Sequence, residues 1–156
     1  MDFWFSSQMQ IIFQLLLAAV LGGLVGLERE YQKRAAGLRT HSLVCLGSAL
    51  FIIISLESFH QWANITGISF DPSRVISGIV LGVGFIGAGL IMHRGFKIEG
   101  LTTAAGIWVV AAIGVAVGLK LYLVAVFTSF LALGILSVLR LLEEKVFWEK
   151  EDEKSE

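Results

Sequence analysis

Five stretches of this chain contain no Asp, Glu, Lys or Arg and consist mostly of apolar residues. They are residues 3–27, 40–56, 75–93, 100–119 and 121–139. The hydrocarbon core of a bilayer is ~30 Å thick and is crossed by about 20 mostly apolar helical residues. The pattern therefore predicts an all-α polytopic membrane protein built as a bundle of five transmembrane helices.

The predicted spans are residues 9–27, 42–58, 75–92, 101–118 and 121–139, within a transmembrane domain of residues 1–140. The last two spans are almost continuous. One helix over residues 101–139 would be about 58 Å long, which is twice the thickness of the hydrocarbon core. We therefore expect a tight turn at Gly118, Leu119 and Lys120. Residues 141–156 are expected to form a short charged cytoplasmic tail.

Basic residues indicate the orientation, because cytoplasmic loops are enriched in Lys and Arg. Ten of the twelve basic residues fall in the loop of residues 28–41, the loop of residues 93–100 and the tail. Only Arg74 and Lys120 fall on the other side. The sequence therefore predicts an N-terminus outside the cell and a C-terminus in the cytoplasm.

Composition leaves little room for anything besides the bundle. The chain has 156 residues, 56% of them hydrophobic, and a net charge of −1. A separate soluble domain of ordinary size does not fit, and the charge predicts no nucleic-acid partner. A single cysteine, Cys45, allows neither an internal disulfide nor a cysteine metal motif. We expect it to behave as a small buried hydrophobe.

Glycine is abundant, with seventeen residues against one proline, and it lies mostly inside the spans. Small residues let membrane helices approach closely, which favours their association. We therefore expect helix packing at Gly22, Gly26, Gly78, Gly82, Gly84, Gly87, Gly89, Gly114 and Gly118. Helices three and four, which are small on two sides, are expected to be central. The alternative is a narrow pore lined by glycine carbonyls.

Charged residues crowd the membrane boundary and leave the spans themselves without carboxylates, Lys or Arg. Intramembrane charges usually mark ion pathways, so the pattern argues against a proton-coupled carrier. One interpretation is a polar cluster at the inner face of the bundle, formed by Glu28, Arg29, Arg39, Thr40, His41 and Glu99. The other is anchoring with surface ion pairs, such as Glu30 with Arg34 four residues later.

Two further polar positions begin helices. Asp71 before Pro72 is typical of a helix start, with Asp as the N-cap and Pro in the first turn. Asp71 and Arg74 therefore mark the outer start of helix three, and Asp71 is also a possible single contact for Mg²⁺. Of Thr102 and Thr103, one is expected to cap helix four. Thr102 is the candidate for a hydrogen bond between helices.

Four separated segments together resemble a known family. They are GGLVGLERE (residues 22–30), AGLRTHSLVCLGSA (36–49), DPSR (71–74) followed by GVGFIGAG (82–89), and GLTTAA (100–105) with Trp108. In this order and spacing they resemble the MgtC/SapB family of bacterial inner-membrane proteins, over roughly residues 10–140. Longer members carry a soluble C-terminal domain, so this chain resembles the short, membrane-only form.

The resemblance implies a role in magnesium homeostasis, or adaptation to low Mg²⁺ or acid stress, and in pathogens a link to virulence. It implies binding and modulation of another membrane complex such as the F-type ATP synthase. The alternative is a Mg²⁺ channel or transporter. No cofactor is expected, Mg²⁺ is a possible ligand, and the sequence assigns no metal site. The sequence holds no Ser/His/Asp set or HExxH motif, so we do not expect an enzyme. A homodimer is a further possibility.

Overall fold

The computed structural model describes the backbone of residues 2–62, 71–94 and 97–141. Its side chains are described for residues 7–59, 71–93 and 97–141. The charged tail expected at residues 141–156 therefore lies, apart from Leu141, outside the described residues.

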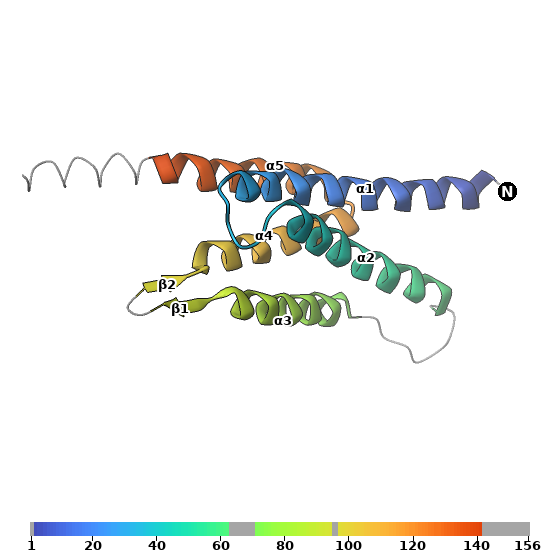
Figure 1. Ribbon diagram of the computed structural model, residues 1–156. Helices are drawn as coiled ribbons and strands as arrows, with labels where there is room; N and C mark the ends of the chain where they lie inside the picture. Colours follow the sequence, from blue (N-terminus) through green and yellow to red (C-terminus); the bar gives the residue numbers. More distant parts are fainter. Residues whose placement is uncertain (1, 63–70, 95–96, 142–156) are drawn as a thin grey trace, which may run out of the picture.

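Five helices form the bundle, in the order that the apolar runs predict (Figure 1). They are α1 (Asp2–Tyr31), α2 (Leu38–Trp62), α3 (Pro72–Leu90), α4 (Leu101–Gly118) and α5 (Tyr122–Gly134), which continues as a π-helical turn (Ile135–Leu139). Five segments are long and apolar enough to span a membrane. They are Ser7–Tyr31, Leu38–Phe59, Pro72–Leu90, Leu101–Gly118 and Tyr122–Leu139. The chain is thus a five-helix membrane protein, as its sequence predicts.

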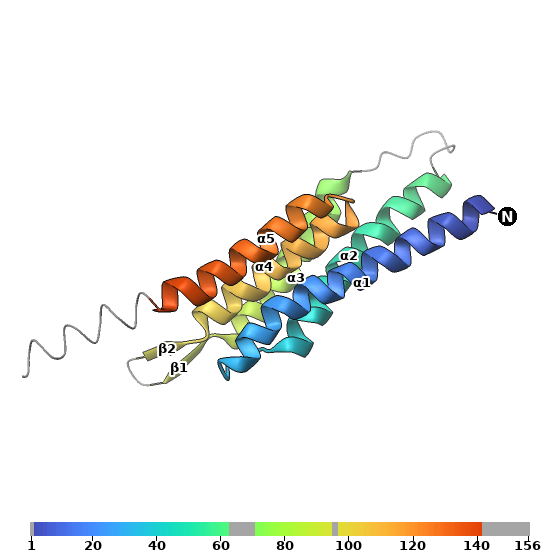
Figure 2. The ribbon, with the colours of Figure 1, turned by 90° about the horizontal axis from the view of Figure 1, so that it is seen from above.

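The packed centre of the bundle is made by α1, α2 and α4, which lie against one another in both views (Figures 1 and 2). In α4, 56% of the apolar window is buried, against 11% in α3 and 11% in α5. The expectation that helices three and four are both central is therefore right for α4 and wrong for α3. Helix α3 packs mainly on α4, and most of its surface is not covered by the rest of the described chain.

Glycines bring the three central helices into close contact. A Cβ added at Gly22 of α1 would lie 2.6 Å from Cys45 Cβ of α2, and one at Gly26 would lie 2.8 Å from His41 Cβ. On the other side of α2, a Cβ at Gly114 would collide with the carbonyl oxygen of Cys45. Gly118 meets Ile52 of α2 in the same way. Helix α2 is thus held between a glycine face of α1 and a glycine face of α4.

The glycines of α3 behave differently from those of the centre. Built Cβ atoms at Gly78, Gly82, Gly84 and Gly89 meet nothing within 4 Å. Only Gly87 lies in ordinary contact, 3.6 Å from Ala104 Cβ of α4. The packing expected at the other four positions is absent within the described chain, because no side chain or backbone of a neighbouring helix reaches those positions.

Local sequence explains the connections. The predicted turn between α4 and α5 is present. Lys120 adopts a left-handed conformation with φ of 63°, and its N–H donates to Val117 O while the N–H of Leu121 donates to Ala116 O. This pair of bonds is the Schellman motif, which ends a helix in one residue of positive φ. The same motif ends α1, with Lys33 at φ 53°.

A short antiparallel hairpin joins α3 to α4, where the sequence indicated only a loop. Its strands are β1 (Met92–Arg94) and β2 (Lys97–Glu99), paired in the register Met92 with Glu99. Strands of three residues carry too little pattern to be recognised from sequence. The hairpin places Glu99 and Gly100 at the first turn of α4.

Candidate functional site

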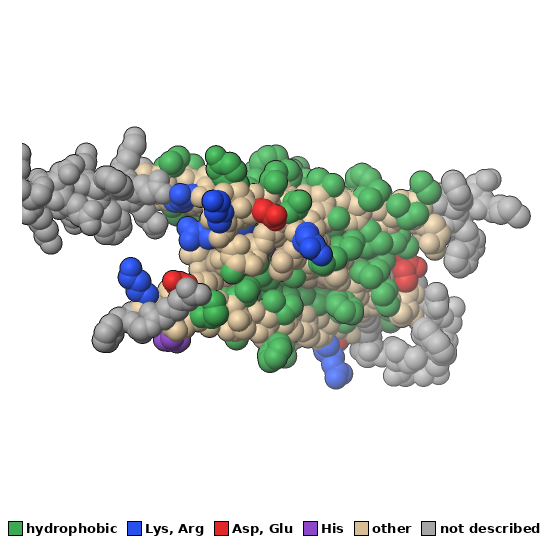
Figure 3. Space-filling view, viewed as in Figure 1, with side chains coloured by type: hydrophobic (Ala, Val, Ile, Leu, Met, Phe, Trp, Pro, Cys, Tyr) green, Lys and Arg blue, Asp and Glu red, His purple; other side chains and the backbone are tan. Residues whose placement is uncertain are grey.

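Basic side chains gather at one end of the bundle, which we call the basic end. It is formed by the last turn of α1, the hairpin, the start of α4 and the end of α5 (Figures 1 and 3). Its described Lys and Arg side chains include Arg29, Lys33, Arg34, Lys97 and Arg140. The positive-inside rule expects this end to face the cytoplasm.

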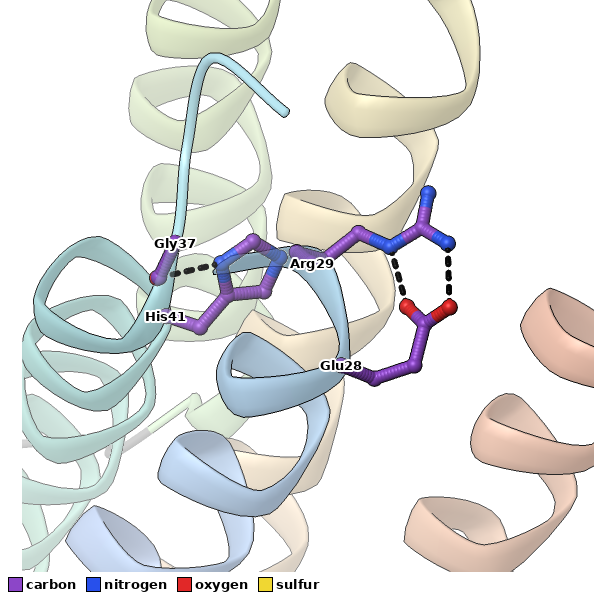
Figure 4. A network of polar contacts seen from close by, with 4 residues as sticks. All are labelled: Glu28, Arg29, Gly37 and His41. Carbon is purple, nitrogen blue, oxygen red and sulfur yellow. Dashed lines mark hydrogen bonds and ion pairs between the residues drawn. The ribbon is translucent and has the colours of Figure 1, made fainter. Parts of the chain in front are cut away.

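Glu28 and Arg29, which are adjacent in sequence, form an ion pair at the end of α1 (Figure 4). Arg29 donates from Nε to Glu28 Oε2 at 2.5 Å and from Nη2 to Oε1 at 2.9 Å. The exposed fractions of the two side chains are 3% for Arg29 and 12% for Glu28. This two-point geometry is the arrangement that a guanidinium and a carboxylate favour. It fixes the position of the Arg29 guanidinium at the basic end.

His41 lies beside this pair in the first turns of α2 (Figure 4). Its side chain is fully buried, and Nδ1 lies 2.9 Å from the carbonyl oxygen of Gly37. A carbonyl only accepts, so Nδ1 carries the donated proton and Nε2 of a neutral ring is the acceptor. Nε2 has no hydrogen-bond partner among the described residues and faces Gly106 of α4. The imidazole therefore fills the contact between α1, α2 and α4.

The structure brings only part of the predicted polar cluster together. Glu28, Arg29 and His41 are neighbours, whereas Arg39 is exposed and Thr40 is half-buried. No hydrogen bond or ion pair joins Arg39 to the pair within the described ranges. Helix periodicity explains the split on α2, because Arg39 and His41 are two residues apart and so point in directions about 160° apart on the helix.

Glu30, for which the alternative interpretation suggested an ion pair with Arg34, contacts the start of α2 instead. Its Oε2 accepts the backbone N–H of Leu38 at 2.7 Å. A helix leaves its first N–H groups without partners inside the helix, so Glu30 of α1 supplies a cap for α2. This contact fixes the loop between the two helices and with it the position of His41.

A cavity of about 610 Å³ opens at the basic end. Glu99, Thr102 and Arg29 all line it, so the structure does join Glu99 to the region of the ion pair. Its walls come from the end of α1 and the loop after it, the end of α3, the hairpin, the start of α4 and the end of α5. The lining residues are Arg29, Lys33, Arg34, Ala35, Leu90, Met92, Ile98, Glu99, Gly100, Leu101, Thr102, Thr103, Ile135, Leu136, Leu139 and Arg140.

The threonines of α4 differ from the expectation. Gly100 is the N-cap residue and no side chain caps the helix, so neither threonine has the predicted capping role. Thr102 is exposed on the cavity wall, and it is Thr103 that is buried, with 4% exposed. Thr103, and not Thr102, is therefore the threonine that faces the interior of the bundle.

At the opposite end, Asp71 caps α3 as predicted. Its Oδ1 accepts the backbone N–H of Ser73 at 2.9 Å and the Ser73 hydroxyl at 2.6 Å, and Pro72 begins the helix. These hydrogen bonds from Ser73 hold the pKa of the Asp71 carboxyl below its ordinary value, with a smaller contribution from Arg74. Asp71 and Arg74 are both exposed and form a helix start, with no contact to the basic end.

One buried polar residue carried no signal in the sequence. Gln14, with 1% exposed, donates from Nε2 to Val117 O at 2.8 Å and to Gly118 O at 3.2 Å. It satisfies the last carbonyls of α4 from the middle of an apolar run. A lone Gln in such a run predicts interhelical hydrogen bonding only once its partner helix is known.

A second opening of about 610 Å³ lies between α2 and α3. Its lining is almost entirely apolar: Leu43, Val44, Gly47, Ser48, Phe51, Val75, Gly78, Ile79, Gly82, Val83 and Ile86. We call it the α2–α3 groove. Of the described side chains, no group of three or more His, Cys, Asp or Glu is placed to hold a metal ion.

The fold and its polar residues define a multi-pass membrane protein with cationic residues at one end. Comparison with known proteins adds the family. A model of the MgtC family matches residues 15–145. The chain therefore belongs to the MgtC family, of bacterial membrane proteins linked to magnesium. The resemblance found in the sequence is confirmed.

Individual relatives agree with this assignment. "Putative magnesium transporter YhiD" of Escherichia coli (strain K12) is 46% identical over 129 residues, covering 83% of this chain and 60% of YhiD. Protein SrpB of Synechococcus elongatus is 39% identical over 146 residues, covering 87% and 78%. Protein MgtC of Salmonella typhimurium (strain LT2) is 44% identical over 108 residues, covering 69% and 43%. No solved structure matches the chain.

Proposed function

We propose that this protein serves magnesium homeostasis in the bacterial inner membrane by binding another membrane complex and modulating it under low Mg²⁺ or acid stress. The observation that carries the proposal is the unpacked surface of α3. Small residues in membrane helices are typical of helix contacts, and four glycines of α3 have no such contact in the described chain. A helix from another protein would supply it.

The α2–α3 groove is the surface on which we expect that helix to lie. Along α3 the groove runs from Val75 to Ile86, about 16 Å or three helical turns. Gly78 and Gly82 lie on its floor, so a partner backbone can approach α3 closely. The candidate partner is a transmembrane helix of the F-type ATP synthase, and a second copy of this chain is the competing outcome.

A substitution that fills the groove tests this proposal without disturbing the fold. Gly82→Leu adds a side chain where a built Cβ meets nothing within 4 Å, and Gly134→Leu on α5 is the matched control with equally open space. Each protein is reconstituted with the F-type ATP synthase, and ATP-driven proton pumping is measured. We expect the wild type and Gly134→Leu to lower pumping and Gly82→Leu to leave it unchanged.

Crosslinking in native membranes at low and high Mg²⁺ provides the opposing result. Two results together would exclude binding of a regulatory partner at this surface. One is that the wild type is crosslinked only to itself in both conditions, and the other is that the wild type, Gly82→Leu and Gly134→Leu all give the same rate of pumping. Equal thermal stability of the three proteins shows that the comparison concerns binding alone.

Transport of Mg²⁺ is the second candidate, and the name of the relative YhiD favours it. Because this chain spans 60% of YhiD and 43% of Salmonella MgtC, activities of those longer proteins are only proposals here. Mg²⁺ flux into liposomes that contain this protein alone decides the matter. Glu28→Gln keeps a hydrogen-bond acceptor for Arg29. If the wild type carries Mg²⁺ flux and Glu28→Gln does not, transport and not modulation is the function.

A further inference from the structure

The cavity at the basic end combines a cationic rim with an apolar wall. Arg29 lines it from the end of α1, Lys33 and Arg34 from the loop that follows, and Arg140 from the end of α5. Against these four basic side chains stands one acidic side chain, Glu99. Ligand cavities are typically about 300–1,000 Å³ in volume, so a cavity of about 610 Å³ is large enough for a small anionic group.

Not all of this charge is available to a ligand. Arg29 is paired with Glu28 through Nε and Nη2, and both Glu99 and Arg140 have interactions of their own. Lys33 and Arg34 are exposed at the rim, and no ion pair with either is present in the described residues. The cavity therefore keeps a positive balance and favours an anion.

The start of α4 adds a second attraction for an anion. Gly100 precedes the helix in a left-handed conformation with φ of 92°, and no side chain caps the first turn. That turn has no acidic residue, and it lines the cavity through Leu101, Thr102 and Thr103. The free N–H groups of a helix start carry partial positive charge and are typical binding sites for phosphate.

The place of the cavity along the helices distinguishes a lipid from a soluble anion. The apolar segment of α1 ends at Tyr31, that of α4 begins at Leu101 and that of α5 ends at Leu139. The cavity lies at all three limits, which is the depth of the lipid headgroups. Ile135, Leu136 and Leu139 continue from it along α5, a helix that leaves most of its surface to the bilayer.

We propose that this cavity binds an anionic phospholipid, with its phosphate near Arg34 and the start of α4 and its acyl chains along α5. Basic pockets between transmembrane helices on the cytoplasmic side are suited to anionic headgroups. The site is independent of the proposed partner, because it lies at the basic end and not in the α2–α3 groove.

Native mass spectrometry of the full chain in neutral detergent tests the site, with phosphatidylglycerol and phosphatidylcholine of equal acyl composition. We expect the wild type to bind phosphatidylglycerol about tenfold more tightly than phosphatidylcholine. Lys33→Gln with Arg34→Gln should weaken phosphatidylglycerol binding roughly thirtyfold. Arg39→Gln is the matched control, since Arg39 is an exposed cation that does not line the cavity.

A second pair of variants separates binding from folding. Thr102→Asp puts a carboxylate in the first turn of α4, which stabilises a helix but repels a phosphate. Thr102→Asn is its neutral counterpart. We expect Thr102→Asp to lose phosphatidylglycerol binding while its melting temperature without lipid equals or exceeds that of Thr102→Asn.

Three results would overturn the proposal. They are equal binding of the two lipids by the wild type, equal binding of phosphatidylglycerol by the two Thr102 variants, and full displacement of phosphatidylglycerol by millimolar inorganic phosphate. The last would identify a soluble phosphate as the ligand. Loss of proton-pump modulation with intact lipid selectivity would instead contradict only the proposed function.

Discussion

Helices α3 and α4 are nearly equal in length and both are apolar and rich in small residues, yet they occupy opposite environments. Gly114 and Gly118 of α4 allow contact with the backbone and side chains of α2. Gly78 and Gly82 of α3 lie in open space. Glycine spacing therefore marks a helix surface that allows close approach. Whether that surface belongs to the core or to an interface depends on which helix lies beside it.

The largest effect should follow from closing the space between α2 and α4. Gly114→Ala places a methyl group against the carbonyl oxygen of Cys45 and 2.9 Å from Ser48 Cβ. Backbone cannot yield as a flexible side chain does, so we expect a loss of unfolding free energy of about 3 kcal/mol. Gly82→Ala on α3 is the control and should change it by less than ~0.5 kcal/mol. Unfolding in mixed micelles of increasing SDS content measures both, and equal losses would remove the contrast between the two helices.

Removing one partner of the buried ion pair should cost nearly as much. Glu28→Ala leaves the guanidinium of Arg29 buried without its carboxylate, and breaking such a pair typically costs about 3–5 kcal/mol. Because 12% of the Glu28 side chain is exposed, we expect the lower limit. Arg39→Ala, at an exposed cation of α2, is the control. Replacing both Glu28 and Arg29 by Met should restore most of the stability, and failure to do so in the same SDS titration would show that the pair itself specifies the fold.

A moderate effect is expected where α1 supports α4. Gln14→Leu keeps the side-chain volume but removes the side-chain donor from the carbonyls of Val117 and Gly118. Val117 O keeps the N–H of Lys120, so the loss falls mainly on the carbonyl of Gly118. Unsatisfied buried polar groups cost about 1–3 kcal/mol, and we expect about 1.5 kcal/mol. The nearby Gln10, whose amide oxygen accepts from Lys120 Nζ at 3.5 Å, provides the exposed control. Gln10→Leu should be silent in thermal unfolding, and a silent Gln14→Leu would mean that water replaces the lost donor.

The smallest effect concerns pH and the start of α3. The pKa of Asp71 is held below its ordinary value of 3.8 by the hydrogen bonds from Ser73. The cap therefore contributes fully above that ordinary value and is lost as the pH falls through the lowered pKa. We expect the exchange protection of the Ser73 amide to stay constant from pH 7 to pH 5 and to fall in more acidic solution. In Asp71→Asn the protection should not depend on pH, and a matching fall there would exclude the carboxylate as its cause.

Local signals predicted much of this molecule. The spans followed from length and hydropathy, the cap at Asp71 from the residue pair with Pro72, and the turn at Lys120 from the impossible length of a single helix. The exposure of Gly78 and Gly82, the donor role of Gln14 and the hairpin were not predictable. Each depends on which helix lies beside which, and small residues predict close approach without naming the neighbour. Glu28 and Arg29 were both in the predicted cluster. That Arg39 lies apart from them could be learned only from the structure, because it depends on which face of α2 packs against α1.

The connection between α3 and α4 has a mechanical consequence. A Cβ at Gly100 would collide with the carbonyl oxygen of Leu90, so the last residue of α3 is pressed against the residue that begins α4. Toward its other end, α3 has open space at Gly78 and Gly82. One end of α3 is thus fixed against α4, and we expect the proposed partner helix to bind along the part of α3 that carries Gly78 and Gly82. We expect a tilt of α3 on such binding to move the start of α4 as well, because Gly100 lies against Leu90.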